Sequence, residues 1–146
     1  MQVRKGFSLV EVLVAAVIAI IALLGLLATA AYFERYSVRR ALLRQASGIL
    51  SNRLEIVKSM PYQNVTEVKL NNGANNCLEA LNNCTSSNSP NCVERIVENK
   101  TRKFGLYYRI VENPSFQIKE VNLTVCWKYR GKLNSVSGDT IVRNRQ

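Results

Sequence analysis

Four cysteines are the side chains in this sequence that could carry covalent or metal chemistry: Cys77, Cys84, Cys92 and Cys126. Their spacing, C-x6-C-x7-C with a distant fourth member, fits neither a zinc ribbon nor a CxxC redox pair. The chain has no His, which excludes Ser-His-Asp and Cys-His catalytic sites and the HExxH zinc site. The sequence therefore predicts two disulfides of open connectivity, and no enzyme activity, metal or cofactor.

A carboxylate at the start of a long apolar run is the second feature with chemical consequences. Of residues 7–31, 21 of 25 are apolar, and residues 12–31 contain no charge. As a helix, those 20 residues measure about 30 Å, the thickness of a bilayer core. Glu11 would cost about 2–3 kcal/mol to insert without a partner. We expect it either to reach water at the headgroup level or to meet a cation from another chain.

A cleaved secretory signal is the alternative interpretation of this run, because Ala28-Thr29-Ala30 resembles a cleavage site. The apolar core is longer than such signals have, and the helical pattern continues beyond it, which favours a retained span. Basic residues flank both ends of the span, so their count does not decide its orientation. They are Arg4, Lys5, Arg35, Arg39, Arg40 and Arg44.

Residues 4–11 read Arg-Lys-Gly-Phe-Ser-Leu-Val-Glu and precede the apolar run. This segment resembles the class III signal of type IV pilins and pseudopilins, in which a short basic leader and a Gly precede Phe-(Ser/Thr)-Leu-(Ile/Val)-Glu. The resemblance implies cleavage after Gly6 by a prepilin peptidase and N-methylation of Phe7. It implies that Glu11 guides subunit docking. It also implies a cytoplasmic leader and a periplasmic globular part, first in the bacterial inner membrane and then in a filament.

Residues 32–59 continue the helical pattern with a more polar surface. One predicted apolar stripe repeats every seven residues, with two members on intermediate turns. Its members are Tyr36, Leu43, Leu50 and Val57, with Ala46 and Leu54 between them. Pro61 ends the pattern because it cannot continue a helix. The stripe needs a sheet to cover it.

The C-terminal third has the two-residue period of β-strands. The apolar positions are Phe104, Leu106, Tyr108 and Ile110 in one run, and Val121, Leu123, Val125 and Trp127 in the next. Phe116 and Ile118 have the opposite parity, which predicts a bulge near Lys119-Glu120. Gly131 predicts a turn, and residues 140–143 a last short strand. We expect an antiparallel meander with one apolar face.

The fold class is thus expected to be α+β and type IV pilin-like, with a long N-terminal helix packed on a small sheet. The expected divisions are a leader at 1–6, a transmembrane and filament-core helix at 7–31, an amphipathic helix at 32–60 and a disulfide-containing, β-rich domain at 61–146. The Asn-rich residues 71–92 are expected to form a long surface loop pinned by cysteines. Cys126 should point away from the helix and pair with a loop cysteine.

The resemblance implies a minor pilin that initiates or supports filament assembly. Residues 121–127 resemble the penultimate strand of PilV-type minor pilins, and many major pilins carry a Pro within the apolar helix, which this chain lacks. The implied partners are other pilins, the prepilin peptidase and the inner-membrane assembly platform. Two alternatives stay open. A type II secretion pseudopilin shares every N-terminal feature, and a competence pilin could bind DNA through the net charge of +10.

Overall fold

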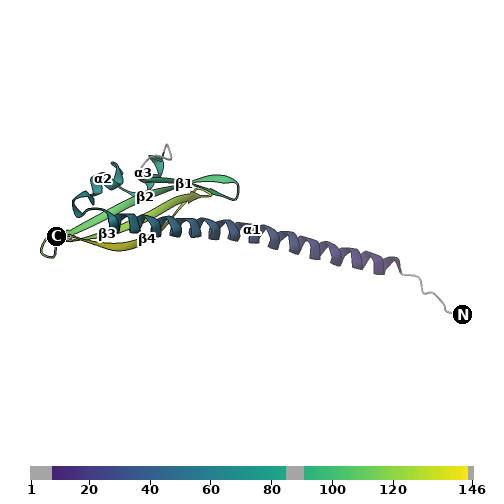
Figure 1. The fold of residues 1–146 in the computed structure, drawn as a ribbon. Coiled ribbons are helices and arrows are strands. Elements are labelled where there is room, and N and C mark those ends of the chain that lie inside the picture. Colours follow the sequence, from purple (N-terminus) through teal and green to yellow (C-terminus); the bar gives the residue numbers. More distant parts are fainter. Residues whose placement is uncertain (1–7, 85–90, 145–146) are drawn as a thin grey trace. The chain divides into compact units, whose positions relative to one another are not determined.

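The computed structural model describes residues 8–84 and 91–144 (Figure 1). Its elements in chain order are α1 (Leu9–Ser59), the 3-10 turn η1 (Tyr62–Asn64), α2 (Glu67–Asn71), α3 (Cys77–Asn82), β1 (Cys92–Val97), β2 (Lys100–Asn113), β3 (Ile118–Tyr129) and β4 (Lys132–Arg143). The chain divides into two compact units, residues 1–37 and residues 38–146, which we call unit 1 and unit 2. Helix α1 belongs to both.

Helix α1 confirms the prediction of one long helix ending before Pro61. Its first turn forms at Ser8, whose carbonyl oxygen accepts hydrogen bonds from the backbone N–H groups of Glu11 at 3.0 Å and Val12 at 3.2 Å. Its last residue is Ser59, because Pro61 disfavours helical geometry in the preceding residue and cannot supply the next helical N–H.

The four strands form an antiparallel meander in the order β1-β2-β3-β4, which confirms the predicted α+β fold. Pairing between β3 and β4 is continuous from Ile118 opposite Arg143 to Tyr129 opposite Lys132. The turn that joins them places Arg130 and Gly131 at positive φ, 51° and 77°. This is the backbone that a two-residue hairpin loop requires, so the turn predicted at Gly131 is confirmed.

The predicted bulge near Lys119-Glu120 is wrong, because pairing is regular on both sides of β3. Lys119 takes the core-facing position that the alternation assigns to it. Its ammonium donates hydrogen bonds to the carbonyl oxygens of Tyr62 at 3.2 Å and Val65 at 3.1 Å, so a buried cation is satisfied there. Phe116, which suggested the bulge, lies before β3 begins and is 74% exposed.

Two strands differ from the sequence-based expectation. Strand β4 covers residues 132–143 instead of only 140–143, and strand β1 was not predicted. Residues 134–139 of β4 read Asn-Ser-Val-Ser-Gly-Asp, a polar run with low strand propensity. Its pairing with the whole of β3 overrides that local preference.

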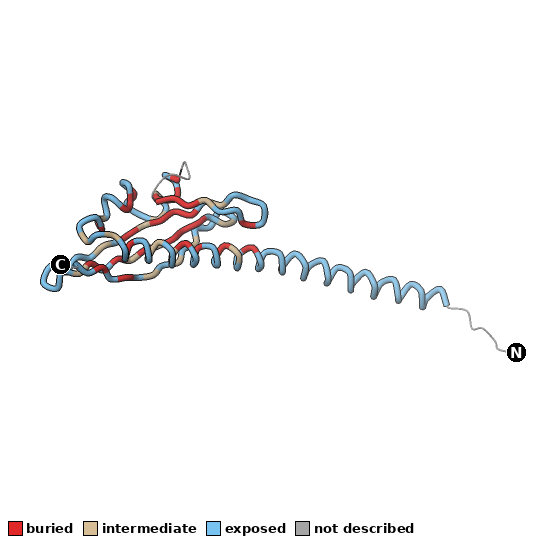
Figure 2. Tube along the Cα trace, viewed as in Figure 1, coloured by how far each residue is buried: buried red, intermediate tan, exposed pale blue. Residues whose placement is uncertain are grey.

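Within unit 2, α1 packs on one face of the sheet, and its buried positions follow the sheet in Figure 2. They are Val38, Leu42, Ala46, Ile49 and Val57. The predicted stripe was therefore partly wrong, since Tyr36 and Leu43 are 46% and 47% exposed. A seven-residue repeat drifts by about 20° per heptad on a straight α-helix. Two heptads before Val57, that drift has carried Leu43 away from the sheet.

The opposite face of the sheet is covered by helix α3, so residues 71–92 do not form one long loop as predicted. Asn76 caps α3, its side-chain oxygen accepting a hydrogen bond from the Glu79 N–H at 2.9 Å. The helix lies very close to β2, because a Cβ on Gly105 would come within 2.7 Å of the Leu81 nitrogen. A glycine is required at that position for the two backbones to approach.

Strand β2 extends beyond the end of β1, and Asn71 completes its exposed edge. The Asn71 side chain donates a hydrogen bond to the Tyr108 carbonyl oxygen and accepts one from the Tyr108 N–H, both at 2.7 Å. Asn91 in turn donates to the Asn71 carbonyl oxygen at 2.9 Å. Glu67 accepts a hydrogen bond from the Ile110 N–H at 2.7 Å. These polar side chains occupy the place of a neighbouring strand.

Candidate functional site

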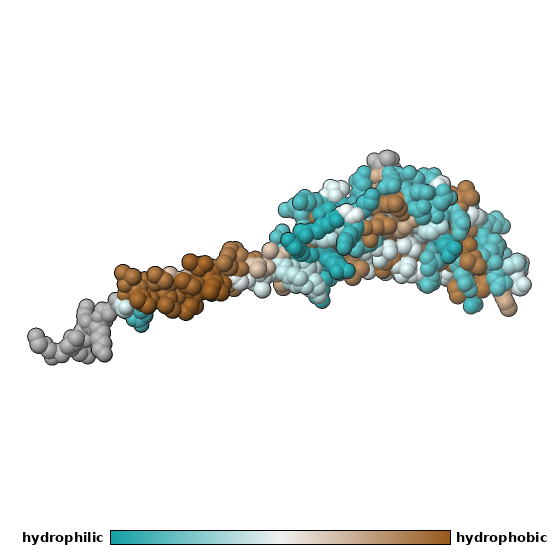
Figure 3. Space-filling model, turned by 180° about the vertical axis from the view of Figure 1, so that it is seen from behind, coloured by the Kyte–Doolittle hydropathy of each residue, from teal (hydrophilic) through white to brown (hydrophobic). Residues whose placement is uncertain are grey.

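In unit 1 the structure describes residues 8–37, and all of them are exposed. Figure 3 shows the apolar part of this segment as a continuous hydrophobic surface. By length and composition, α1 could cross a membrane. Thr29 is the one hydroxyl-bearing residue in the uncharged run 12–31. Its hydroxyl donates to the carbonyl oxygens of Gly25 at 2.8 Å and Leu26 at 2.9 Å. The segment therefore presents no unsatisfied hydroxyl to a hydrocarbon environment.

Glu11 lies in the first turn of α1, where the positive end of the helix dipole favours a carboxylate. The first basic residue after it is Arg35, about 36 Å further along a helix. A cationic partner for Glu11 must therefore come from the residues before the helix or from another chain. Gly6 and Phe7, the predicted processing site, lie outside the described residues.

Small residues follow Glu11 along one side of the helix. Ala15, Ala19 and Ala22 stand four, eight and eleven positions after it, which places all four residues within about 80° of the helix circumference. Alanines permit a neighbouring apolar helix to approach closely. The Glu11 carboxylate and these three alanines thus lie on the same side of the helix.

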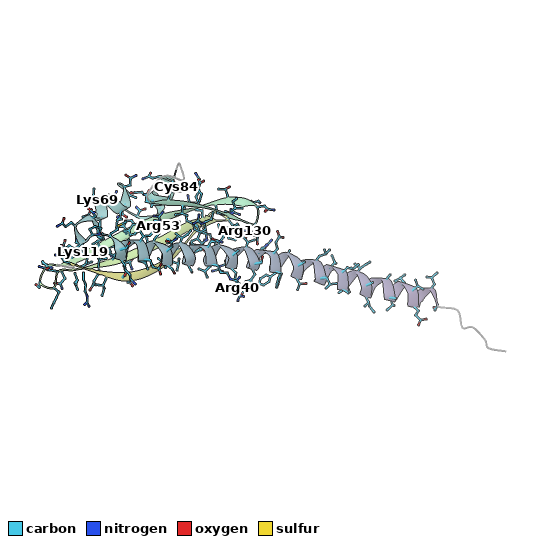
Figure 4. The ribbon with its side chains drawn as sticks, viewed as in Figure 1. Arg40, Arg53, Lys69, Cys84, Lys119 and Arg130 are labelled. Carbon is cyan, nitrogen blue, oxygen red and sulfur yellow. A yellow bond between two sulfur atoms is a disulfide. The ribbon has the colours of Figure 1, made fainter. Side chains whose placement is uncertain are left out.

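The four cysteines form two disulfides in unit 2, and the structure resolves the connectivity that the sequence left open. Cys77 pairs with Cys126 and joins α3 to β3, with a Cα–Cα distance of 6.1 Å. Cys84 pairs with Cys92 and ties the end of the α3 region to the start of β1, at 5.2 Å (Figure 4). Cys126 is buried on the face away from α1, as its strand parity predicted. Its partner, however, begins a helix and does not lie in a loop.

A hollow of about 330 Å³ separates α1 from the edge strand β1. Its charged lining consists of Arg53 on α1 and Glu94 and Arg95 on β1. Burial raises the pKa of the nearby Tyr108 phenol above its ordinary value, and the positive charge of Arg53 opposes that rise. At the other end of the sheet, burial and the carboxylate of Glu112, which accepts a 2.8 Å hydrogen bond, raise the pKa of Tyr62.

Comparison with known proteins places the N-terminal segment. Residues 1–32 match the family model of the prokaryotic N-terminal methylation motif. Neither a search of curated proteins nor a search of solved structures found a match to the chain. The motif is the signal of type IV pilins and pseudopilins, so this chain carries a prepilin-type N-terminus. Together with the apolar helix, the motif indicates membrane anchoring and assembly with other pilin-type subunits.

Proposed function

We propose that this protein is a minor pilin of a bacterial type IV pilus, of the PilV type. Prepilin peptidase removes residues 1–6, and Phe7 becomes the methylated N-terminus. Residues 7–31 anchor the subunit in the inner membrane, residues 32–60 lead into the periplasmic domain, and residues 61–146 form that domain. The subunit then enters the filament, where it initiates or supports assembly. One observation carries the proposal: the methylation motif at 1–32 runs directly into a fully exposed apolar helix.

The proposed mechanism places one ion pair inside an apolar helix bundle. Cleavage leaves a cationic amine on Phe7, and Glu11 follows one helical turn later. The absence of another basic residue before Arg35 supports a pair between the Glu11 carboxylate of an incoming chain and the Phe7 amine of its neighbour. At low dielectric such a pair is far stronger than in water, although desolvation of both groups cancels part of the gain.

The apolar surface and the ion pair have different tasks in this mechanism. Lipid tails are as apolar as leucine side chains, so moving α1 from the membrane to a helix bundle changes hydrophobic burial little. Close packing along Ala15, Ala19 and Ala22 then supplies attraction without a fixed position. The charge pair supplies the register.

Glu11→Gln tests the proposal because it keeps the shape and removes the charge. The variant should enter the membrane and be processed, and its amount in sheared filaments relative to membranes should fall severalfold. Glu11→Asp should retain part of the incorporation. Glu34→Gln is the matched control, since Glu34 is also exposed on α1 but follows the apolar run. Undiminished incorporation of Glu11→Gln would contradict the ion pair and would mean that Glu11 only contacts water at the membrane surface.

A type II secretion pseudopilin is the second candidate, since the matched motif is common to both classes. Deleting the gene separates the two. Loss of surface pili with normal protein secretion supports the minor pilin, whereas loss of secretion with normal pili supports the pseudopilin.

A further inference from the structure

Two hairpin turns lie at the same end of the sheet in unit 2, because alternate turns of a meander share an end. One is formed by Glu98 and Asn99, and the other by Arg130 and Gly131. Exposed cations surround them. They are Lys100 beside the first turn, and Lys128, Arg130 and Lys132 at the second.

Helix α1 enters unit 2 at this same end. The direction in which α1 crosses the sheet follows from two contacts. Leu50 lies at the middle of the sheet, because a Cβ on Gly138, midway along β4, would lie 3.2 Å from its side chain. The Tyr62 carbonyl oxygen, beyond the helix, accepts a hydrogen bond from Lys119 at the far end of the sheet. Val38 therefore lies at the end that carries the two turns. In Figure 4 the labels of Arg40 and Arg130 both stand near this end of the sheet.

The exposed Arg39 and Arg44 of α1 add to the positive charge there. We define the basic end of unit 2 by six exposed residues: Arg39, Arg44, Lys100, Lys128, Arg130 and Lys132. Residues 38–52, 98–100 and 128–132 contain one acidic residue, Glu98. Such an excess of one sign on one end makes a surface for a polyanion.

We propose that the basic end binds anionic phospholipid headgroups while the subunit is held in the membrane. Six residues separate Ala31 from Val38, at most about 25 Å of chain in any conformation. Tyr32, 73% exposed, is an aromatic residue of the kind that lies at a membrane–water interface. The chain therefore keeps the basic end within about 25 Å of the run 12–31 that spans the bilayer, near enough for its cations to reach headgroups. The inference rests on the membrane insertion contained in the proposed function.

Headgroups fit this surface better than nucleic acid does. The cations lie at the end of the sheet where α1 enters the unit, and the chain length between Ala31 and Val38 keeps that end within reach of the bilayer. The chain also lacks a recognisable module of interleaved aromatic and basic residues for base recognition. Each basic residue near an anionic surface strengthens binding about fivefold.

Hydrogen exchange of the full chain in nanodiscs tests the proposal. Discs of phosphatidylcholine alone are compared with discs containing about 30% phosphatidylglycerol, an anionic lipid. Amides at residues 98–100 and 130–132 should exchange more slowly in the anionic discs by at least about fivefold, the effect of a single basic residue. The difference should disappear in about 0.5 M salt, which screens exposed charges.

Variants separate this surface from the overall charge. The triple change K128Q/R130Q/K132Q removes three of the six cations and should reduce the difference between the discs severalfold. The control K69Q/R109Q/R143Q removes equal charge from other exposed positions and should preserve it. Equal exchange in both kinds of disc would overturn the proposal while leaving membrane insertion intact. Failure of the chain to enter neutral discs would overturn both. Protection of the same turns by duplex DNA in neutral discs, without an effect of phosphatidylglycerol, would identify a nucleic-acid surface instead.

Discussion

Replacing Asn71 with Ala should strongly destabilise unit 2, because this side chain takes the place of a strand along β2. Asn71 is 5% exposed and satisfies both the N–H and the carbonyl oxygen of Tyr108 at 2.7 Å. Its removal leaves two buried backbone groups without partners, at about 1–3 kcal/mol each. Allowing for partial entry of water, we expect a loss of about 2–4 kcal/mol in the free energy of unfolding.

Asn71→Asp sharpens this test because it retains an acceptor for the Tyr108 N–H. It also directs a carboxylate oxygen at the Tyr108 carbonyl oxygen, so we expect no rescue relative to Ala. Asn75→Ala is the control, since Asn75 is exposed and its amide bonds Glu79 at 3.1 Å. It should cost about 0.5 kcal/mol or less.

Denaturant unfolding of the full chain in detergent measures these differences. Trp127 is the one tryptophan of the chain and is buried in the core, so its fluorescence reports the unfolding of unit 2. An Asn71→Ala variant as stable as the Asn75→Ala control would refute the role of Asn71 in completing the sheet edge.

Two further predictions concern the packing of α3 against the sheet. Cys126→Ser opens a bridge between residues 49 positions apart and should lower the free energy of unfolding by about 4 kcal/mol, because the unfolded chain is no longer held in a loop. Non-reducing peptide maps of the unaltered chain should show only the pairs Cys77–Cys126 and Cys84–Cys92. Full alkylation of the cysteines without reductant would contradict this pairing. Gly105→Ala should cost about 1–3 kcal/mol, because the new Cβ meets backbone atoms of Leu81 at 2.7 and 2.9 Å. Gly48→Ala, where a Cβ meets nothing within 4 Å, should instead be neutral or stabilising by up to about 1 kcal/mol in the same denaturant unfolding experiment. Equal losses of stability at both glycines would contradict the close packing of α3 on β2.

The strong local patterns of the sequence predicted the parts of the fold that depend on periodicity. The uncharged run predicted the exposed helix of unit 1. The alternation through Leu106 and Leu123 predicted the core-facing sides of β2 and β3 and hence the outward direction of Cys126. These features survive because each depends on a repeat of the chain itself, a helical or two-residue period.

The parts that the sequence could not predict depend on contacts between distant segments. Lys119 occupies a core-facing strand position only because carbonyl groups of residues 62 and 65 receive its ammonium. In the sequence, Asn71 is one asparagine among many in a region typical of turns. Its hydrogen bonds to the Tyr108 backbone form only because β2 extends past the end of β1. Strand β4 forms from a polar run because β3 offers it a complete ladder. At the candidate assembly site, Glu11 was identified by its position in the motif, and the ion pair proposed for it stays a prediction.

The intact mass of the protein isolated from membranes of cells with an active prepilin peptidase shows directly whether the chain is processed as a prepilin. We predict a chain that begins at Phe7, carries one added methyl group and has lost residues 1–6. Gly6→Leu should retain those six residues, because a bulky side chain would obstruct the approach of the peptidase to the chain. A wild-type mass corresponding to all 146 residues, or to a chain beginning at Ala31 after signal-peptide cleavage, would contradict it.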